Sequence, residues 1–391
     1  MATSFVHILP DARFADDFIS TLSSLFGEQS HHQFFSKTAG PLQKVTYNAG
    51  KLTPLPADDY EVQKWMESLS ADTELVVHYL DARTGHCLLQ SDLKASLGWV
   101  FWGADFYSSC DEQDYILPKT RSIFPLPIGQ RVPAFAKKPI LRKLDHWYYR
   151  TIKLRQRQKL LQGILRKLTH IYHYNSFEID LIRRTYKTTA NQVPFMYPRF
   201  FTVSTFDQQK VDSQSDQHSA DTITILLGNS ASPYLNHLDG LDLIPAEDKV
   251  HVTVPLSYGN PAYTESLHKN LKNYNGPDLS VLDQYLAAED YYNLLSRMHL
   301  YLSPSIRSIG MGNITTMLAL GKSVVLFPNN PGSAYLKECG FHIEDLHHDL
   351  SVSSLERFAL QVPHTANQEL AHKLFSKEAI ERNYTSIFAS Y

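Results

Sequence analysis

A short segment late in the chain carries the residues best suited to hold a diphosphate. Arg307 precedes Gly310, Gly312 and Asn313, and the helical pattern of residues 314–320 follows at once. Glycines at a helix N-terminus leave backbone N–H groups and the positive end of the helix dipole open to an anion. An arginine adds a forked donor that suits phosphate. The segment is therefore either a diphosphate-binding turn or an ordinary turn whose glycines allow close packing.

A second candidate is an acid that follows an apolar run in the first half of the chain. Residues 97–102 (L-G-W-V-F-W) are almost all apolar, which predicts a strand buried on both faces, as in a parallel sheet. Asp105 comes just after it, at the edge where open α/β sheets bind ligands. There it could contact a bound ligand. The alternative is that Asp105 only caps the following turn or helix.

The third candidate is a strongly basic stretch. Residues 115–170 contain 14 Lys or Arg and one acid, Asp145. Such a stretch favours an anionic membrane surface or nucleic acid, and the neighbouring aromatic residues 147–149 are typical of a membrane interface. We therefore expect membrane or lipid-diphosphate contact and no nucleic acid. The residues expected at this surface, where the membrane or a lipid-diphosphate acceptor would bind, are Lys137, Lys138, Arg142, Lys143, Trp147, Arg150, Arg155 and Arg157.

Composition limits the class of protein. The 391 residues are 43% hydrophobic and 20% charged with a net charge of −3, which is typical of a globular protein of about two domains. The three cysteines are far apart and predict reduced thiols in a cytosolic protein. No apolar run reaches the ~20 residues of a membrane-spanning helix, so any membrane role should be peripheral. The sequence also lacks an Asp-x-Asp pair and an H-E-x-x-H motif, so we expect no metal and no cofactor.

These candidates need a scaffold that brings strand ends to one edge. Strands alternate with helices in both halves of the chain, which predicts two α/β domains. We expect a first, acceptor- and membrane-facing domain over residues 1–205 and a polar linker over 206–221. A second domain, whose strand edge should bind a nucleotide-linked donor, should cover residues 222–365. A C-terminal helix over 366–391 should pack back on the first domain.

Four motifs in this order resemble one known family. They are F-W-G-A-D-F-Y (101–107), I-L-L-G-N-S (225–230), V-P-L-S-Y-G (254–259) and R-x-x-G-x-G (307–312). Together they resemble glycosyltransferase family 56, the dTDP-N-acetylfucosamine:lipid II N-acetylfucosaminyltransferases of enterobacterial common antigen synthesis. The resemblance covers roughly residues 95–330.

The resemblance implies two Rossmann-like domains that face a cleft, the glycosyltransferase B-type fold. It implies that a 4-acetamido-4,6-dideoxyhexose passes from a dTDP-sugar to a polyprenyl-diphosphate-linked glycan at the cytoplasmic face of a bacterial inner membrane. Two of the expected donor-side residues need comment. Glu289, in the first turn of its predicted helix, could serve only to complement the helix dipole. Asn313 stands where the family pattern has Thr. On the acceptor side, Asp105 is the candidate general base for an acceptor hydroxyl. The residues expected on the donor side are Gly228, Asn229, Ser230, Ser257, Tyr258, Glu289, Arg307, Gly310, Gly312 and Asn313.

The competing class is a non-catalytic membrane- or nucleic-acid-binding protein built on a degenerate transferase fold. It would bind through residues 137–167 in a salt-sensitive way and show no turnover.

Overall fold

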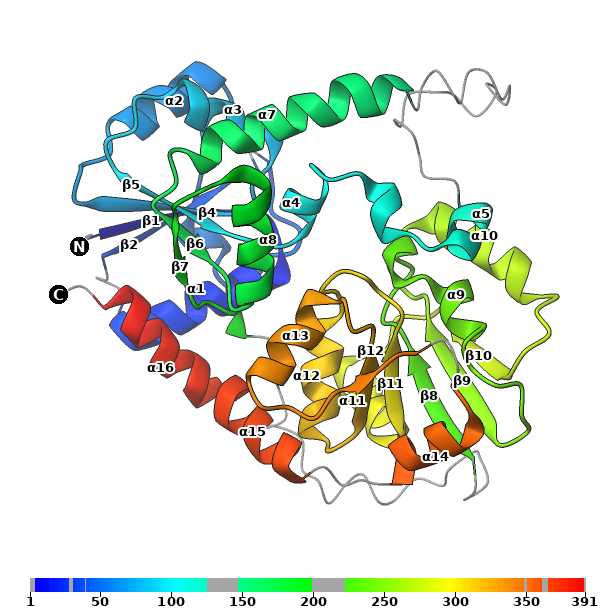
Figure 1. Ribbon diagram of the computed structural model, residues 1–391. Helices are drawn as coiled ribbons and strands as arrows, with labels where there is room; N and C mark the ends of the chain where they lie inside the picture. The colour runs from blue at the N-terminus through cyan, green and yellow to red at the C-terminus, as the bar shows by residue number, and fades with distance from the viewer. Residues whose placement is uncertain are drawn as a thin grey trace. The chain divides into compact units, whose positions relative to one another are not determined.

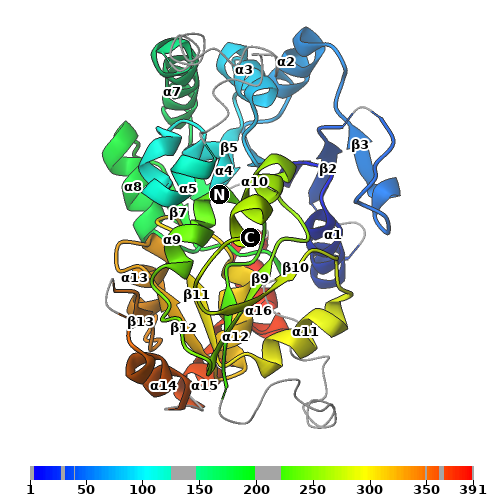
Figure 2. The same ribbon diagram turned by 90° about the vertical axis from the view of Figure 1, so that its right-hand side faces the viewer.

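The computed structural model describes residues 4–27, 31–38, 40–124, 147–198, 222–347, 350–360 and 365–389. The chain divides into two compact units (Figures 1 and 2). The first comprises Met1–Asp111, Pro127–Arg199 and Glu378–Tyr391, and the second comprises Glu112–Leu126 and Phe200–Lys377.

The first unit is a parallel sheet covered by helices on both faces (Figure 1). Its strand order is β3-β2-β1-β4-β5-β6-β7, and every strand pairs in parallel with its neighbours. The strands are β1 (Ser4–Leu9), β2 (His32–Ser36), β3 (Leu52–Pro54), β4 (Thr73–His78), β5 (Ser96–Val100), β6 (His170–Tyr172) and β7 (Asn191–Val193). The central strands β4 and β5 are buried along almost their whole length because both faces of the sheet are covered.

Two helices from opposite ends of the chain cover one face of this sheet. Helix α1 (Arg13–Phe26) and the C-terminal helix α16 (Lys377–Phe388) contribute Phe18, Tyr384 and Phe388 to a shared core. The other helices of the unit are α2 (Asp59–Glu67), α3 (Ala82–Gln90), α4 (Ala104–Tyr107), α7 (Leu154–Leu165) and α8 (Ser176–Tyr186).

The second unit repeats the design with another parallel sheet, in the order β10-β9-β8-β11-β12-β13. Its strands are β8 (Ile223–Leu227), β9 (Val250–Pro255), β10 (Asp278–Leu282), β11 (Leu300–Ser303), β12 (Ser323–Leu326) and β13 (Glu344–Asp345). Its helices are α5 (Pro118–Ile123), α9 (His237–Leu241), α10 (Pro261–Leu271), α11 (Ala288–Arg297), α12 (Met311–Ala319), α13 (Pro331–Glu338), α14 (Val352–Leu360) and α15 (Thr365–Phe375). The predicted α/β class is confirmed.

The units differ from the expected domain ranges in two places. Residues 112–126 belong to the second unit, because the Asp239 carboxylate accepts the backbone N–H groups of Lys119 and Thr120 at 2.9 and 2.8 Å and so caps α5. Helix α15 also belongs to the second unit, where it packs against α12, so only α16 joins the first unit. The expected linker, residues 206–221, lies outside the described residues.

Candidate active site

The donor-side candidates gather at one edge of the second sheet. Strands β9, β8 and β11 are neighbours and run in parallel, so their carboxyl ends meet at the same edge. Residues 228–230 follow β8, residues 257 and 258 follow β9, and residues 304–310 follow β11. Three segments that are far apart in the sequence thus line the edge where open α/β sheets bind ligands.

The turn between β11 and α12 requires its first glycine. Gly310 is the N-cap of α12 and has a φ of 78°, in the left-handed region. A Cβ atom there would lie 2.6 Å from Tyr301 Oη and 2.7 Å from Asn229 Oδ1, closer than such atoms approach. Gly312 differs, because a Cβ atom there would meet nothing within 4 Å. The first turn of α12 therefore presents its N–H groups beside open space.

Arg307 lies on the same turn and is held by aromatic rings. Its side chain is 7% exposed, and its guanidinium carbon lies 4.2 Å from the Tyr234 ring centroid and 5.9 Å from that of Tyr115. The backbone is fixed as well, because the Asn330 amide donates to the carbonyls of Ser305 and Arg307, both at 2.8 Å. The arginine is thus preorganised at the strand edge.

Asn229 connects the β8 turn to the other two segments. Its Nδ2 donates to Tyr258 Oη at 2.7 Å, and its buried Oδ1 faces Gly310 and has no hydrogen-bond partner in the described part of the chain. His237 lies behind the same turn, and its Nδ1 hydrogen-bonds to Tyr263 Oη at 2.9 Å. Burial lowers the pKa of His237 to about 3, so its imidazole is neutral. The groups around the turn are therefore uncharged.

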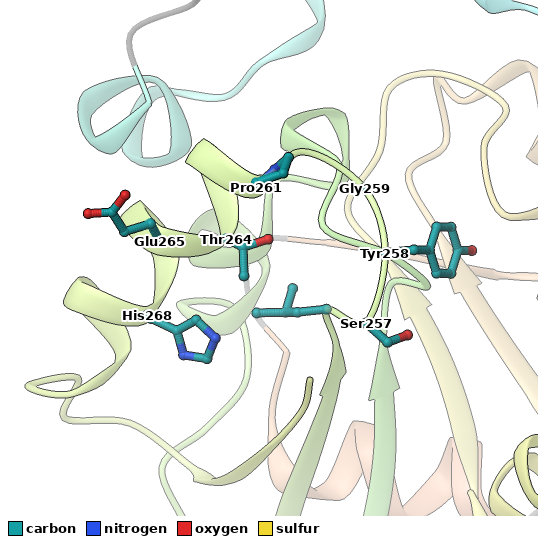
Figure 3. Close-up of a pocket in the computed structure, with 8 residues that line it drawn as sticks. Ser257, Tyr258, Gly259, Pro261, Thr264, Glu265 and His268 are labelled. Carbon is teal, nitrogen blue, oxygen red and sulfur yellow. The ribbon is translucent and has the colours of Figure 1, made fainter. Parts of the chain in front are cut away.

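The remaining donor-side candidates lie around this centre. Asn313 donates to Tyr291 Oη at 2.6 Å, which ties α12 to α11, whereas Glu289 is exposed in the first turn of α11. Ser257 and Tyr258 border a pocket of about 370 Å³ between the β9–α10 loop and α10. In Figure 3 the ring of Tyr258 points away from the side of the loop on which Thr264 and His268 lie.

In the first unit, Asp105 is buried and its carboxylate accepts three hydrogen bonds. The residue is 7% exposed and lies in α4. Its Oδ2 accepts from Trp99 Nε1 at 2.7 Å and from the Leu80 N–H at 3.1 Å, and its Oδ1 accepts from the Trp102 N–H at 3.1 Å. Burial raises the pKa of Asp105 and these hydrogen bonds oppose the rise. The carboxylate thus joins the ends of β4 and β5.

A lysine and a second acid lie at the same edge. Lys37, just after β2, donates to the Asp81 carboxylate at 2.6 Å and to the carbonyl of Tyr79. Burial lowers the pKa of Lys37, and the Asp81 and Asp105 charges oppose that shift. Asp81 also caps α3 through the N–H of Thr84. This ion pair gives the edge both signs of charge.

The basic surface is partly described. Lys137, Lys138, Arg142 and Lys143 lie outside the described residues. The chain is helical from residue 147 to 165, with a π-helical turn over Tyr149–Lys153.

The described part of this helix exposes both apolar and cationic side chains. Trp147, Tyr148 and Ile152 are 60%, 39% and 37% exposed. Arg150 pairs with Asp111 at 2.5 Å, Arg157 donates to the Ser108 carbonyl at 3.2 Å, and Arg155 borders a pocket of about 340 Å³ between α7 and α8.

Several residues that build these edges were not among the predicted site residues, although Asn236 and His237 lie just downstream of the 225–230 motif. Asn236 is fully buried, and its Nδ2 donates to the Pro304 carbonyl at 2.9 Å while its Oδ1 accepts from the Leu117 N–H at 2.8 Å. Tyr234 and Asn330 position Arg307. Asn236 has a left-handed φ of 48°, which asparagine tolerates. The amino-acid sequence alone did not indicate which residues hydrogen-bond to Asn236.

The described ranges hold no group of three His, Cys, Asp or Glu side chains arranged to bind a metal ion. Within the same ranges, no helix combines the length and the apolar character needed to cross a bilayer.

Two units, each a parallel sheet flanked by helices, are the architecture of the glycosyltransferase B-type fold. Solved structures with this fold include a sucrose-phosphate synthase from Thermosynechococcus elongatus, with 13% identity, a TM-score of 0.61 and coverage of 100% of both chains. WaaG, a glycosyltransferase involved in lipopolysaccharide biosynthesis, has 12% identity and a TM-score of 0.52, over 99% of this chain and 100% of that chain. The trehalose-6-phosphate phosphatase N-terminal domain of Candida albicans has 12% identity and a TM-score of 0.56, over 99% and 96%.

The family follows from the sequence profile that matches the chain. The profile of 4-alpha-L-fucosyltransferase glycosyl transferase group 56 matches residues 146–385, more than half of the protein. The chain belongs to this family, which confirms the resemblance seen in the motifs, and it is a glycosyltransferase.

Proposed function

We propose that the protein transfers a 4-acetamido-4,6-dideoxyhexose from a dTDP-sugar to a polyprenyl-diphosphate-linked glycan in bacterial surface polysaccharide synthesis. The observation that carries this proposal is the turn at the second sheet's edge, where Arg307 and the N-terminus of α12 meet beside the open space at Gly312. The group description names fucosyl transfer, and the proposed sugar is also a 6-deoxyhexose.

The chemistry asks two things of the protein. An acceptor hydroxyl oxygen forms a bond to the anomeric carbon of the donor, while the bond from that carbon to the diphosphate oxygen breaks. The departing dTDP gains negative charge, which the N–H groups of α12 and the guanidinium of Arg307 would stabilise. The hydroxyl proton must pass to a base, and our predicted base is Asp105, which lies at the carboxyl edge of the first sheet and whose pKa is raised by burial.

The same proposal places the protein at a membrane as a peripheral component. The acceptor's polyprenyl chain would lie in the cytoplasmic leaflet of the inner membrane. The helix that contains Trp147 would meet this surface, since its exposed Trp147, Tyr148 and Ile152 suit the interfacial region and the nearby arginines suit anionic headgroups.

Donor binding is tested by thermal unfolding with dTDP. Purified protein should be stabilised by dTDP, and Arg307→Ala should abolish the stabilisation. Arg357→Ala is the matched control, because the Arg357 guanidinium also lies over an aromatic ring, Phe358 at 5.1 Å, but on α14. If none of dTDP, UDP and GDP shifts the unfolding temperature of the wild type, the donor proposal is wrong.

Membrane contact is tested by co-sedimentation with lipid vesicles. The wild type should bind vesicles that contain an anionic lipid more strongly than neutral vesicles, and added salt should weaken the binding. The double variant Trp147→Ala, Ile152→Ala should bind anionic vesicles less. Equal binding of the wild type to both kinds of vesicle would contradict the electrostatic part of the proposal.

The reaction itself is tested by mass spectrometry of lipid-linked oligosaccharides from cells with and without the gene. Loss of one 4-acetamido-4,6-dideoxyhexose from these lipids supports the proposal. An unchanged lipid profile would contradict it, whatever the result of the dTDP experiment.

A further inference from the structure

Two aromatic side chains meet at the carboxyl edge of the first sheet. Tyr79 directly follows β4, and Trp102 follows the neighbouring strand β5. Their ring centroids are 5.3 Å apart with the planes at 50°, and Phe14 packs edge-on against Trp102 at 4.3 Å. Both Tyr79 and Trp102 are only half-buried, so each keeps part of its surface open to solvent.

Tyr79 has an unusual backbone that its surroundings enforce. Its φ is 62°, in the left-handed region that a tyrosine rarely occupies. The Lys37 ammonium donates to its carbonyl, and its own N–H donates to the Val100 carbonyl at 3.3 Å. Strained residues persist only where neighbours over-determine them, and they cluster at ligand sites.

Polar groups border these rings on the same edge. The Trp102 N–H and the adjacent Leu80 N–H both donate to the Asp105 carboxylate. Asp81, which is two residues after Tyr79, pairs with Lys37. A pyranose ring has faces of C–H groups and a rim of hydroxyls, so aromatic rings flanked by charged polar groups suit it.

We propose that Trp102 and Tyr79 form the binding surface for a sugar ring of the acceptor. This inference rests on the proposed function, because it takes the acceptor to be a glycan. It adds the side chains that would hold that glycan, and it uses none of the donor-side residues.

A buried row of imidazoles fixes the position of Trp102. The indole Nε1 donates to Tyr197 Oη at 3.1 Å, and Tyr197 Oη lies 2.5 Å from His78 Nδ1. His78 Nε2 lies 3.2 Å from His7 Nδ1, and His7 Nε2 lies 3.0 Å from His32 Nδ1. Burial lowers the pKa of all three histidines, to about 4 for His32, so they are neutral.

One set of tautomers gives every hydrogen bond in this row a donor and an acceptor. With its proton on Nε2, His32 accepts at Nδ1 from His7 Nε2. The same tautomer at His7 and His78 lets His7 Nδ1 accept from His78 Nε2, and His78 Nδ1 accept from Tyr197 Oη.

The other end of the row agrees with this direction. An indole N–H can only donate, so Tyr197 Oη accepts from Trp102 while it donates to His78. The row therefore holds the Trp102 indole through Nε1, the only polar atom of that ring. Tyr197 is thus a positioning residue for the sugar-binding surface.

Sugar binding is tested by saturation-transfer NMR on the full chain with N,N′-diacetylchitobiose as the probe. The wild type should transfer saturation to the C–H protons of the probe. Trp102→Ala should weaken its affinity about threefold to tenfold. Trp65→Ala is the matched control, because Trp65 is also half-buried in an aromatic pair, with Phe35 at 4.5 Å, but it lies on α2.

Trp102→Phe serves where the alanine variant fails to fold, since it keeps an aromatic ring but loses the indole N–H and part of the ring surface. It should weaken probe binding less than alanine does. No transfer to the probe in the wild type, or equal affinities for the wild type, Trp102→Ala and Trp102→Phe, would overturn the proposal.

The positioning role of Tyr197 is tested with Tyr197→Phe. This variant should weaken chitobiose binding and shift the indole N–H resonance of Trp102, while the dTDP affinity stays unchanged. Tyr384→Phe is the control, because it also deletes a phenol hydroxyl from the same core, one that donates to the Met196 carbonyl at 3.0 Å. If both variants affect the probe equally, Tyr197 has only a structural role.

The two proposals fail separately. A wild type that shows no dTDP-induced stabilisation but transfers saturation to chitobiose would contradict the donor assignment alone. A wild type stabilised by dTDP that shows no transfer would contradict the sugar-binding surface alone.

Discussion

Gly312 offers the sharpest test of the diphosphate turn, because adding one methyl group should separate stability from binding. Gly312 is exposed in the first turn of α12, and an added Cβ atom meets nothing within 4 Å. Alanine in place of glycine favours a helix by roughly 0.5–1 kcal/mol. For a unit of this size, Gly312→Ala should therefore raise the unfolding temperature of the free protein by about 1–4 °C.

The effect on the donor should be opposite in sign. A diphosphate that accepts hydrogen bonds from the first turn of α12 must approach the backbone where the methyl group would stand. Loss of one charge-assisted hydrogen bond costs about 1.5–3 kcal/mol, which weakens binding roughly tenfold to a hundredfold. Isothermal titration with dTDP measures this directly, and thermal unfolding without ligand measures the gain in stability.

Gly310→Ala provides the contrast. Its φ of 78° and the 2.6 Å approach to Tyr301 Oη should make this variant lose both stability and dTDP binding. If Gly312→Ala is more stable and binds dTDP as tightly as the wild type, the diphosphate does not lie against this turn. The glycines would then serve packing alone.

Three further predictions follow from the described contacts. Asp105→Asn should lower the free energy of unfolding by about 1–3 kcal/mol, measured by denaturant unfolding, because an amide cannot accept all three N–H groups that face the carboxylate. The product yield of the same variant is measured as well, and an unchanged yield would exclude Asp105 as the base. Stability should fall as the pH drops below about 6.5, because the lowered pKa values of His7, His32 and His78 make unfolding take up protons. The fall should approach about 1.4 kcal/mol per pH unit for each histidine. Unfolding measured at pH 7.5 and 5.5 tests this, and equal stability at both would contradict it. Arg307→Lys should weaken dTDP binding about tenfold in calorimetric titration, because lysine keeps the charge but lacks the planar guanidinium over Tyr234. Unchanged affinity would show that charge alone matters.

Local sequence signals predicted the secondary structure around residues 305–327 well. The apolar run and glycines around residues 305–327 predicted a turn, a helix and a strand, and the structure has α12 and β12 there. The helix begins at Met311, three residues before the expected start, because Gly310 adopts the left-handed conformation that suits an N-cap. Such signals are local, so a single sequence carries them.

Contacts between distant residues could not be predicted in the same way. The assignment of residues 112–126 to the second unit depends on Asp239 and Asn236, more than 100 positions along the chain. The partner of Trp102 in the imidazole row, Tyr197, is 95 positions away. Without an alignment, no pattern in one sequence indicates which of the 18 histidines meet in the core.

The two strand edges differ in how they satisfy their polar groups, and this difference bears on how each would work. At the first edge, three N–H groups already satisfy Asp105, and Lys37 satisfies Asp81. At the second edge, the buried Asn229 Oδ1 faces Gly310 with no hydrogen-bond partner in the described part of the chain. A buried acceptor without a partner costs about 1–3 kcal/mol, and a ligand or a rotation of the amide that supplied a donor would recover it. We therefore expect dTDP to rearrange Asn229 and its bond to Tyr258, whereas a sugar would meet a surface at Trp102 that is already fixed.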